Sequence, residues 1–97
     1  MIIHGAELPN SNGRRAYPLD ITNVVAKHFV ERVTIPTNPF GPHEHDQPEL
    51  WYILEGTGFV LLGEAEHVVV AGDLITIADG IRHGIRTDSN VRWLCLG

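Results

Sequence analysis

From residue 24 onward, short runs rich in β-branched and aromatic residues alternate with clusters of Gly, Pro, Asp, Asn and Ser. The predicted strands are 24–28, 29–35, 50–54, 59–62, 67–71, 74–77, 81–87 and 91–96, and turn residues at 55–58 are expected to end the third of them. No segment combines helix caps with a sustained apolar period of about 3.6 residues. Short strands at intervals of about 8–12 residues predict an all-β sandwich or barrel. The lack of crossover helices excludes a parallel βαβ architecture.

The length of 97 residues predicts a single domain over 1–97, because two cores would each be too small to be stable. Residues 1–22 are the least patterned and are expected to form an N-terminal arm or an edge strand, with the barrel at 23–97. A core this small favours help from a second subunit, and a 16-residue N-terminal stretch is typically functional, disordered or engaged with a partner. We therefore expect a homodimer.

Charge and cysteine content limit the partners and the compartment. The net charge of −5 disfavours binding to nucleic acid phosphates. The longest apolar runs, 59–62 and 68–71, are far shorter than the roughly 20 residues that span a bilayer, so no membrane association is expected. The first residues lack the pattern of a secretion signal. With Cys95 alone no internal disulfide can form, which fits a reducing compartment, and we expect a cytoplasmic protein.

Histidine is the most informative residue type in the chain. In an extended segment His43 and His45 would project from the same face about 6–7 Å apart, close enough to converge on one ion. Glu49 follows after Pro48, where the chain can bend back, and His83 lies in a separate predicted strand. Three nitrogens and one carboxylate oxygen suit Mn, Fe, Ni, Co or Zn. The first two histidines alone would equally fit a solvated strand surface.

The spacing of the whole set resembles the two motifs of the cupin superfamily. The first motif corresponds to His43, His45, Glu49 and Gly56, and the second to Gly72, Gly80 and His83, with 15 residues between them. The chain departs from the motifs at three positions of turn or strand geometry, none of them a ligand: Thr37, Ala78 and Thr87.

The resemblance implies a cupin-type jelly-roll β-barrel that holds one divalent transition-metal ion near the centre of its cavity. The ligands carried over are His43, His45, Glu49 and His83. In cupins two barrels often pack side by side and exchange an N-terminal strand, which Ile2 and Ile3 could supply here.

Strand alternation predicts which side chains surround the ion. The pocket residues expected beside the ligands are Trp51, Ile53, Ile85 and Trp93. By the same alternation Ile81, Val91 and Cys95 are expected to face inward, and Arg82 and Arg86 outward. Such a wall suits a small, partly apolar ligand with one or two oxygen atoms. The alternative is that these residues simply fill a barrel whose interior is barely wider than its side chains.

The remaining candidates are expected to be structural. Tyr52 alternates away from Glu49, and Cys95 fits a small buried hydrophobic residue whose redox or nucleophilic role would require a nearby histidine. No role is predicted for three histidines and two arginines: His4, His28, His67, Arg14 and Arg15.

Two functions fit the site. The first is a metal-dependent enzyme acting on a small organic substrate, similar to cupin dioxygenases, isomerases, decarboxylases or lyases. Glu44 and Glu55 are the nearest other acids, and Glu44 should point away from the site. Because no obvious separate proton shuttle is present, chemistry at the metal itself is favoured. The alternative is a non-catalytic module that binds or senses a metabolite. A metal-free structural barrel of the seed-storage kind is disfavoured by the complete ligand set.

Overall fold

The computed structural model describes residues 1–20, 22 and 25–97. These residues form one short 3-10 helix and eight β-strands: η1 (Gly5–Glu7), β1 (Arg14–Ala16), β2 (Phe29–Thr34), β3 (Phe40–His43), β4 (Glu49–Leu62), β5 (Ala65–Val70), β6 (Leu74–Ile77), β7 (His83–Arg86) and β8 (Val91–Leu96). All strand pairings are antiparallel. The fold is the all-β jelly-roll barrel that the sequence predicts. In the described part of the chain, no helix is long and apolar enough to cross a membrane.

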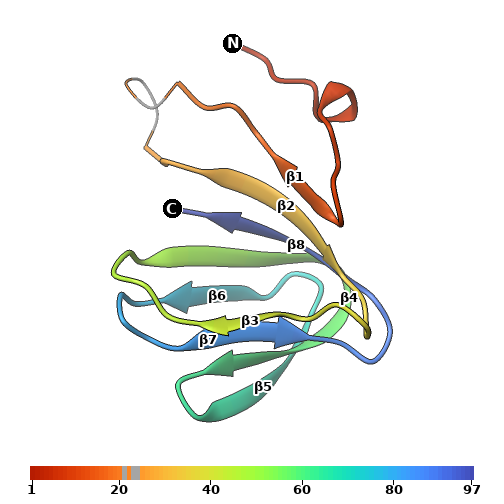
Figure 1. Cartoon of the computed structure of the whole chain (residues 1–97), viewed down its shortest axis with the longest axis vertical. Coiled ribbons are helices and arrows are strands. Elements are labelled where there is room, and N and C mark those ends of the chain that lie inside the picture. Colours follow the sequence, from red (N-terminus) through yellow and green to blue (C-terminus); the bar gives the residue numbers. More distant parts are fainter. Residues whose placement is uncertain (21, 23–24) are drawn as a thin grey trace.

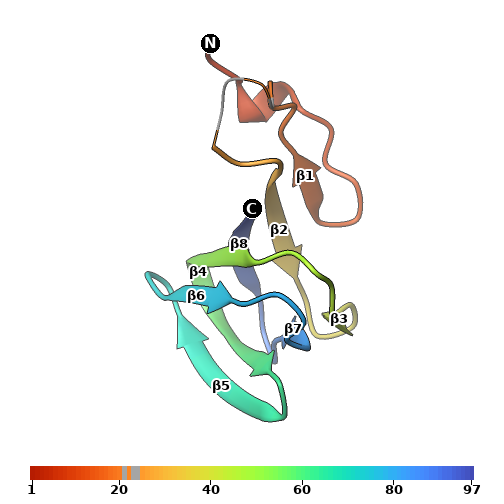
Figure 2. The same cartoon turned by 90° about the vertical axis from the view of Figure 1, so that its left-hand side faces the viewer.

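The 14-residue strand β4 links two sheets. Its first half pairs with β6 and β8, and β8 continues to β2 and β1. Its second half pairs with β5 and β7, and β7 continues to β3. In Figure 1 the first group lies toward the N-terminal end of the molecule and the second group toward β5, and Figure 2 shows the same curled arrangement from the side.

The expected turn at 55–58 is wrong, because β4 continues through it. The register between β4 and β8 shifts between Ile53 and Glu55, as at a β-bulge. Gly56 has a φ of +83°, and a Cβ there would collide with the carbonyl oxygen of Asn90. A residue without a side chain therefore lets the strand bend and change sheets without breaking the ladder.

Two other predicted boundaries are also wrong. Residues 25–28 are not part of a strand, and Val24 lies outside the described residues. The predicted strand 81–87 is shorter, since β7 begins at His83 after a turn at 79–80. Ile81 is 40% exposed rather than inward-facing, because strand alternation does not extend into this loop.

The core lies between the inner faces of the two sheets. Of the residues that the structure describes, eleven hydrophobic ones are buried there: Val30, Trp51, Ile53, Val60, Val69, Ile75, Ile77, Ile85, Val91, Trp93 and Cys95. Alternation on β4 and β8 is therefore as predicted, with Tyr52 on the outer face at 39% exposure. At the core centre the indole N–H of Trp93 donates to the hydroxyl of Thr34 at 3.0 Å.

Candidate metal centre

The three predicted histidine ligands come together on one side of the barrel interior. His43 ends β3 and is the register partner of His83 at the start of β7, and His45 follows two residues after β3. The ring centroids are 4.5 Å apart for His43 and His83, 4.7 Å for His45 and His83, and 5.6 Å for His43 and His45. One ring nitrogen from each lies within 4.8 Å of the others. This spacing allows all three to share one ion.

Glu49, the predicted carboxylate ligand, begins β4 beside two of these histidines. Its Oε1 lies 3.5 Å from His45 Nε2 and 3.8 Å from His83 Nε2. The indole N–H of Trp51 donates to the same oxygen at 3.1 Å. Burial opposes ionisation of this carboxyl, but the hydrogen bond from Trp51 and the charges of His45 and His28 outweigh it and lower the pKa of Glu49. The carboxylate is thus held ionised and turned toward the histidines.

The hydrogen bonding of His83 leaves one nitrogen aimed at this group without a partner. His83 Nδ1 lies 2.7 Å from the carbonyl oxygen of Ile81, which can only accept, so Nδ1 carries the proton. Nε2 of the neutral ring then presents a lone pair. This atom is buried, and among the described residues nothing hydrogen-bonds to it. A buried acceptor without a partner is costly unless an ion or water takes it, and a backbone carbonyl on the opposite nitrogen is typical of metal-binding histidine.

Electrostatics favour the neutral form of His43, which could also bind a metal ion. Burial, followed by the neighbouring rings of His83 and His45, lowers the pKa of His43. A neutral imidazole is the form that coordinates metal. Three imidazole nitrogens and a carboxylate oxygen are a donor set that suits a divalent transition-metal ion. The four candidate ligands therefore fit the metal ion that the cupin resemblance implies.

His28, for which the sequence predicts no role, contacts the other oxygen of Glu49. Its Nε2 lies 3.3 Å from Glu49 Oε2 and 3.5 Å from the Sγ of Cys95. His28, Glu49 and Cys95 form a second compact set of potential ligand atoms. Burial, followed by the charge of Glu49, raises the pKa of the Cys95 thiol to about 12, so it stays protonated. His28 precedes β2, and no motif in the sequence signals its approach to Glu49.

The four predicted pocket residues all lie in the core. Trp51, Ile53 and Trp93 are 0% exposed and Ile85 is 2% exposed. The two indoles pack together with centroids 4.4 Å apart, and the Trp51 ring meets His83 edge-on at 5.5 Å. They therefore form the packed wall behind the histidines, which fits the core-filling alternative.

Open hollows border the ligands from outside. One of about 520 Å³ is lined mainly by apolar groups and reaches Glu49. Another, of about 290 Å³, lies at His43 between Pro42, Glu44 and Arg82. Small molecules can thus approach the candidate ligands from two sides.

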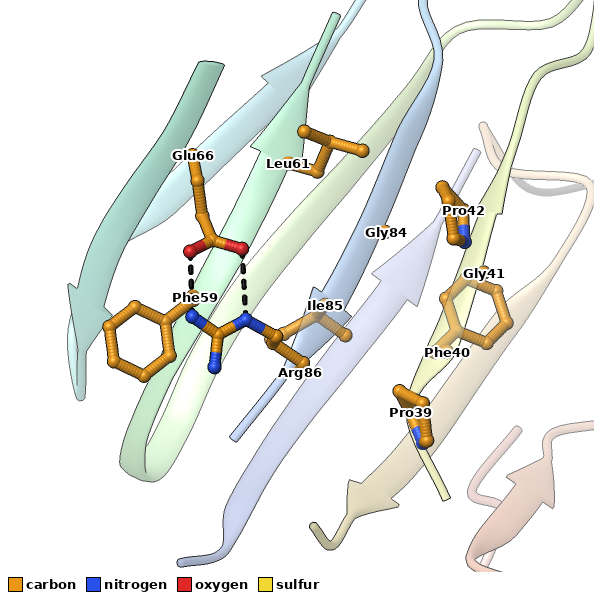
Figure 3. Close-up of a pocket in the computed structure, with 10 residues that line it drawn as sticks. All are labelled: Pro39, Phe40, Gly41, Pro42, Phe59, Leu61, Glu66, Gly84, Ile85 and Arg86. Carbon is orange, nitrogen blue, oxygen red and sulfur yellow. Dashed lines mark hydrogen bonds and ion pairs between the residues drawn. The ribbon is translucent and has the colours of Figure 1, made fainter. Parts of the chain in front are cut away.

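A further hollow of about 220 Å³ lies between β3, β7 and β4 and is bordered by Ile85. Figure 3 shows that the guanidinium of Arg86 is turned to the carboxylate of Glu66 at its rim, with two hydrogen bonds of 2.7 and 2.9 Å. Arg86 also covers the Phe59 ring at 4.2 Å from its centroid. Both polar groups at this rim are already paired.

Comparison with known proteins assigns the family. The family profile of the cupin domain matches residues 32–97. The chain belongs to the cupin family. Among curated proteins, this cupin is 39% identical over 46 residues to the uncharacterized protein y4oW of Sinorhizobium fredii, which is 47% of this chain and only 21% of that protein.

Solved structures agree on the cupin fold. A "predicted oxalate decarboxylase" from Thermotoga maritima matches with a TM-score of 0.82 and 21% identity, over 99% of this chain and 96% of that one. The polyketide cyclase RemF from Streptomyces resistomycificus matches with a TM-score of 0.80 and 21% identity, over 99% and 77% of the two chains. A cupin 2 conserved barrel protein from Salinispora arenicola matches with a TM-score of 0.75 and 24% identity, over 99% and 84%. Identities this low establish the barrel and leave the reaction to be argued from the site.

Proposed function

We propose that this cupin binds one divalent transition-metal ion through His43, His45, Glu49 and His83 and acts with it on a small organic molecule. The observation that carries the proposal is the buried Nε2 of His83, which faces Glu49 and the other histidines and has no hydrogen-bond partner among the described residues. Cupins typically bind metal. Mn, Fe, Ni, Co and Zn all suit the donor set.

When bound, the ion would supply Lewis acidity to oxygen atoms of a substrate. The protein's own groups prepare the site. The Ile81 carbonyl fixes the ring of His83, and the Trp51 indole fixes one oxygen of Glu49. The packed indoles of Trp51 and Trp93 exclude water from the inner side. The reaction could be of the dioxygenase, isomerase, decarboxylase or lyase type. The solved structures with the same fold include proteins named for decarboxylation and cyclisation, which supports a small organic substrate.

A second candidate is a non-catalytic module that binds or senses a metabolite. The observation in its favour is the complete burial of Trp51, Ile53 and Trp93, which leaves the inner wall packed rather than open. Turnover of a bound compound separates the two functions. Homodimer formation and a cytoplasmic location stay predictions.

Elemental analysis of protein purified without added metal tests the proposal. We expect about one transition-metal ion per chain, and almost none in the double variant His45→Ala/His83→Ala, because two of the four ligands are gone. The matched control is His4→Ala/His67→Ala, which removes two exposed imidazoles and should keep its metal. Stoichiometric metal in the first variant would show that the ion is held elsewhere. Screening of oxygen uptake and of small organic acids would then define the reaction.

A further inference from the structure

Three neighbouring strands bring His28, Glu49 and Cys95 together on the inner face of one sheet. Cys95 on β8 is the register partner of Val30 on β2 and of Trp51 on β4. His28 and Glu49 each lie two residues before one of these partners, so strand alternation turns them to the same face as Cys95. The approach of the three side chains therefore follows from the pairing of β2, β8 and β4.

Gly97 leaves the room that these side chains occupy. The N–H of His28 donates to the carbonyl oxygen of Gly97 at 2.9 Å, and the N–H of Gly97 donates to the carbonyl oxygen of His28 at 3.3 Å. A Cβ at Gly97 would lie 3.2 Å from Cε1 of His28 and 3.6 Å from the Cα of Glu49. A side chain there would crowd both residues. The hollow of about 520 Å³ is lined by Glu49 and Gly97, so an ion can approach from solvent.

The separations of the three donor atoms match a tetrahedral zinc site. With bonds of about 2.3 Å to sulfur and about 2.1 Å to nitrogen or oxygen, neighbouring donors in such a site are about 3.4–3.6 Å apart. His28 Nε2 lies 3.3 Å from Glu49 Oε2 and 3.5 Å from the Sγ of Cys95. A hydrogen bond from an ionised imidazole to a carboxylate is typically shorter, at about 2.7–2.9 Å. The spacing therefore fits a shared ion better than a direct pair.

The two oxygens of Glu49 face different donors. Oε1 lies 3.5 Å from the Nε2 of His45 and 3.8 Å from that of His83, whereas Oε2 faces His28. Without an ion the thiol of Cys95 is protonated, since burial and the charge of Glu49 raise its pKa to about 12. A thiol that coordinates a metal ion gives up its proton to the solvent.

We propose that His28, Glu49 and Cys95 form a second metal site, which binds Zn²⁺ through one nitrogen, one oxygen and one sulfur. Zn²⁺ accepts all three kinds of donor, and three protein ligands leave its fourth position open for water or a substrate oxygen. The site shares only Glu49 with the centre under Proposed function and does not need an ion there. It has fewer ligands, one of them shared and one that must lose a proton, so it should fill from added metal rather than retain metal during purification.

Titration with Co²⁺ tests the site, because a cobalt–thiolate bond gives a charge-transfer band in the near ultraviolet and Cys95 is the only cysteine of the chain. The double variant His45→Ala/His83→Ala removes the first centre. In it, and in the wild-type protein, we expect the band to grow with added Co²⁺ and to level off at an equimolar amount. Zn²⁺ should then displace Co²⁺ and abolish the band.

Substitutions of single ligands separate this site from the first centre. In the double variant, a further His28→Ala should weaken Co²⁺ binding by about tenfold or more, whereas His67→Ala, which removes an exposed imidazole, is the matched control and should not. In the otherwise wild-type protein, Cys95→Ser should abolish the band and keep the copurified metal. Glu49→Gln should weaken both sites. Thermal unfolding confirms that each variant is folded.

The absence of the band in wild-type protein with excess Co²⁺ would overturn the inference, as would a band that His28→Ala leaves unchanged. Wild-type protein that copurifies without metal would instead contradict the proposed function. The Co²⁺ band of the double variant does not depend on that result, because this variant lacks two ligands of the first centre. The two proposals can therefore fail separately.

Discussion

Replacing Gly84 by alanine tests whether the spacing of β3 and β7 sets the geometry of the histidine cluster. Gly84 directly follows His83 on β7, and β3 runs antiparallel beside it at close range. A Cβ at Gly84 would lie 2.8 Å from the carbonyl oxygen of Phe40 and 3.0 Å from the Cα of Pro42. An ordinary contact begins at 3.4 Å, so the backbone of β3 must retreat by about 0.6 Å.

This retreat is large for a metal site and modest for the fold. Metal–ligand distances tolerate deviations of about 0.2 Å. His43 is the last residue of β3, the strand that must move. We therefore expect the metal affinity of Gly84→Ala to fall by about tenfold or more. Mutations of residues that orient metal ligands typically have effects of this size. Overpacking should also destabilise the protein by about 1–3 kcal/mol. For a chain of this size that lowers the unfolding temperature by about 4–8 °C per kcal/mol.

Gly63→Ala is the matched control, because its cost has a different origin. Gly63 has a φ of +65°, which strains any other residue, but a Cβ there would meet nothing within 4 Å. This variant should lose stability and keep its metal affinity. Competition with a chromophoric chelator gives the affinities, and thermal unfolding gives the stabilities. If Gly84→Ala loses stability but binds metal as tightly as Gly63→Ala, the spacing of β3 and β7 does not control the site.

Three further outcomes follow from single contacts. His28→Ala should weaken metal binding by about 10-fold, because His28 contacts Oε2 of Glu49 and helps to hold that carboxylate. The exposed His67→Ala should not weaken it, and equal affinities of the two variants in a chelator competition would contradict this role of His28. Thr34→Val should destabilise the protein by about 1–3 kcal/mol, because the buried indole N–H of Trp93 loses its acceptor. Urea unfolding that shows no such loss would refute a stabilising role of this hydrogen bond. The Cys95 thiol, with a pKa raised to about 12, should react with a disulfide reagent at pH 8 far more slowly in the folded protein than in denaturant, and equal rates would show that it is accessible.

The sequence predicts most of the candidate site because three of the four candidate ligands lie in one local motif. His43 and His45 are two residues apart, and Glu49 follows within one bend of the chain, so a short segment carries three candidate ligands. Assigning His83 depended on the cupin resemblance, since the pairing of β3 with β7 is not local. The barrel itself follows from the spacing of short strands.

What the sequence does not predict depends on long-range register. Gly56 lies in a cluster that reads as a turn, and only pairing with β8 on one side and β5 on the other keeps the strand continuous. His28 reaches Glu49 because the chain before β2 is tied to the C-terminus, with the N–H of His28 donating to the carbonyl oxygen of Gly97 at 2.9 Å.

The contact between Glu49 and His83 also explains why the bend at Gly56 matters for the candidate metal centre. His83 is the register partner of Leu62, at the opposite end of β4 from Glu49. A straight strand would place the ends of these 14 residues about 43 Å apart, at about 3.3 Å per residue. Yet the side chains of Glu49 and His83 approach to 3.8 Å. The strand must therefore curl strongly on itself, and the bulge beside Gly56 is where its partners change. The candidate ligands meet only in the closed barrel, so an ion held by Glu49 and His83 would tie the two halves of β4, and with them the two sheets, together.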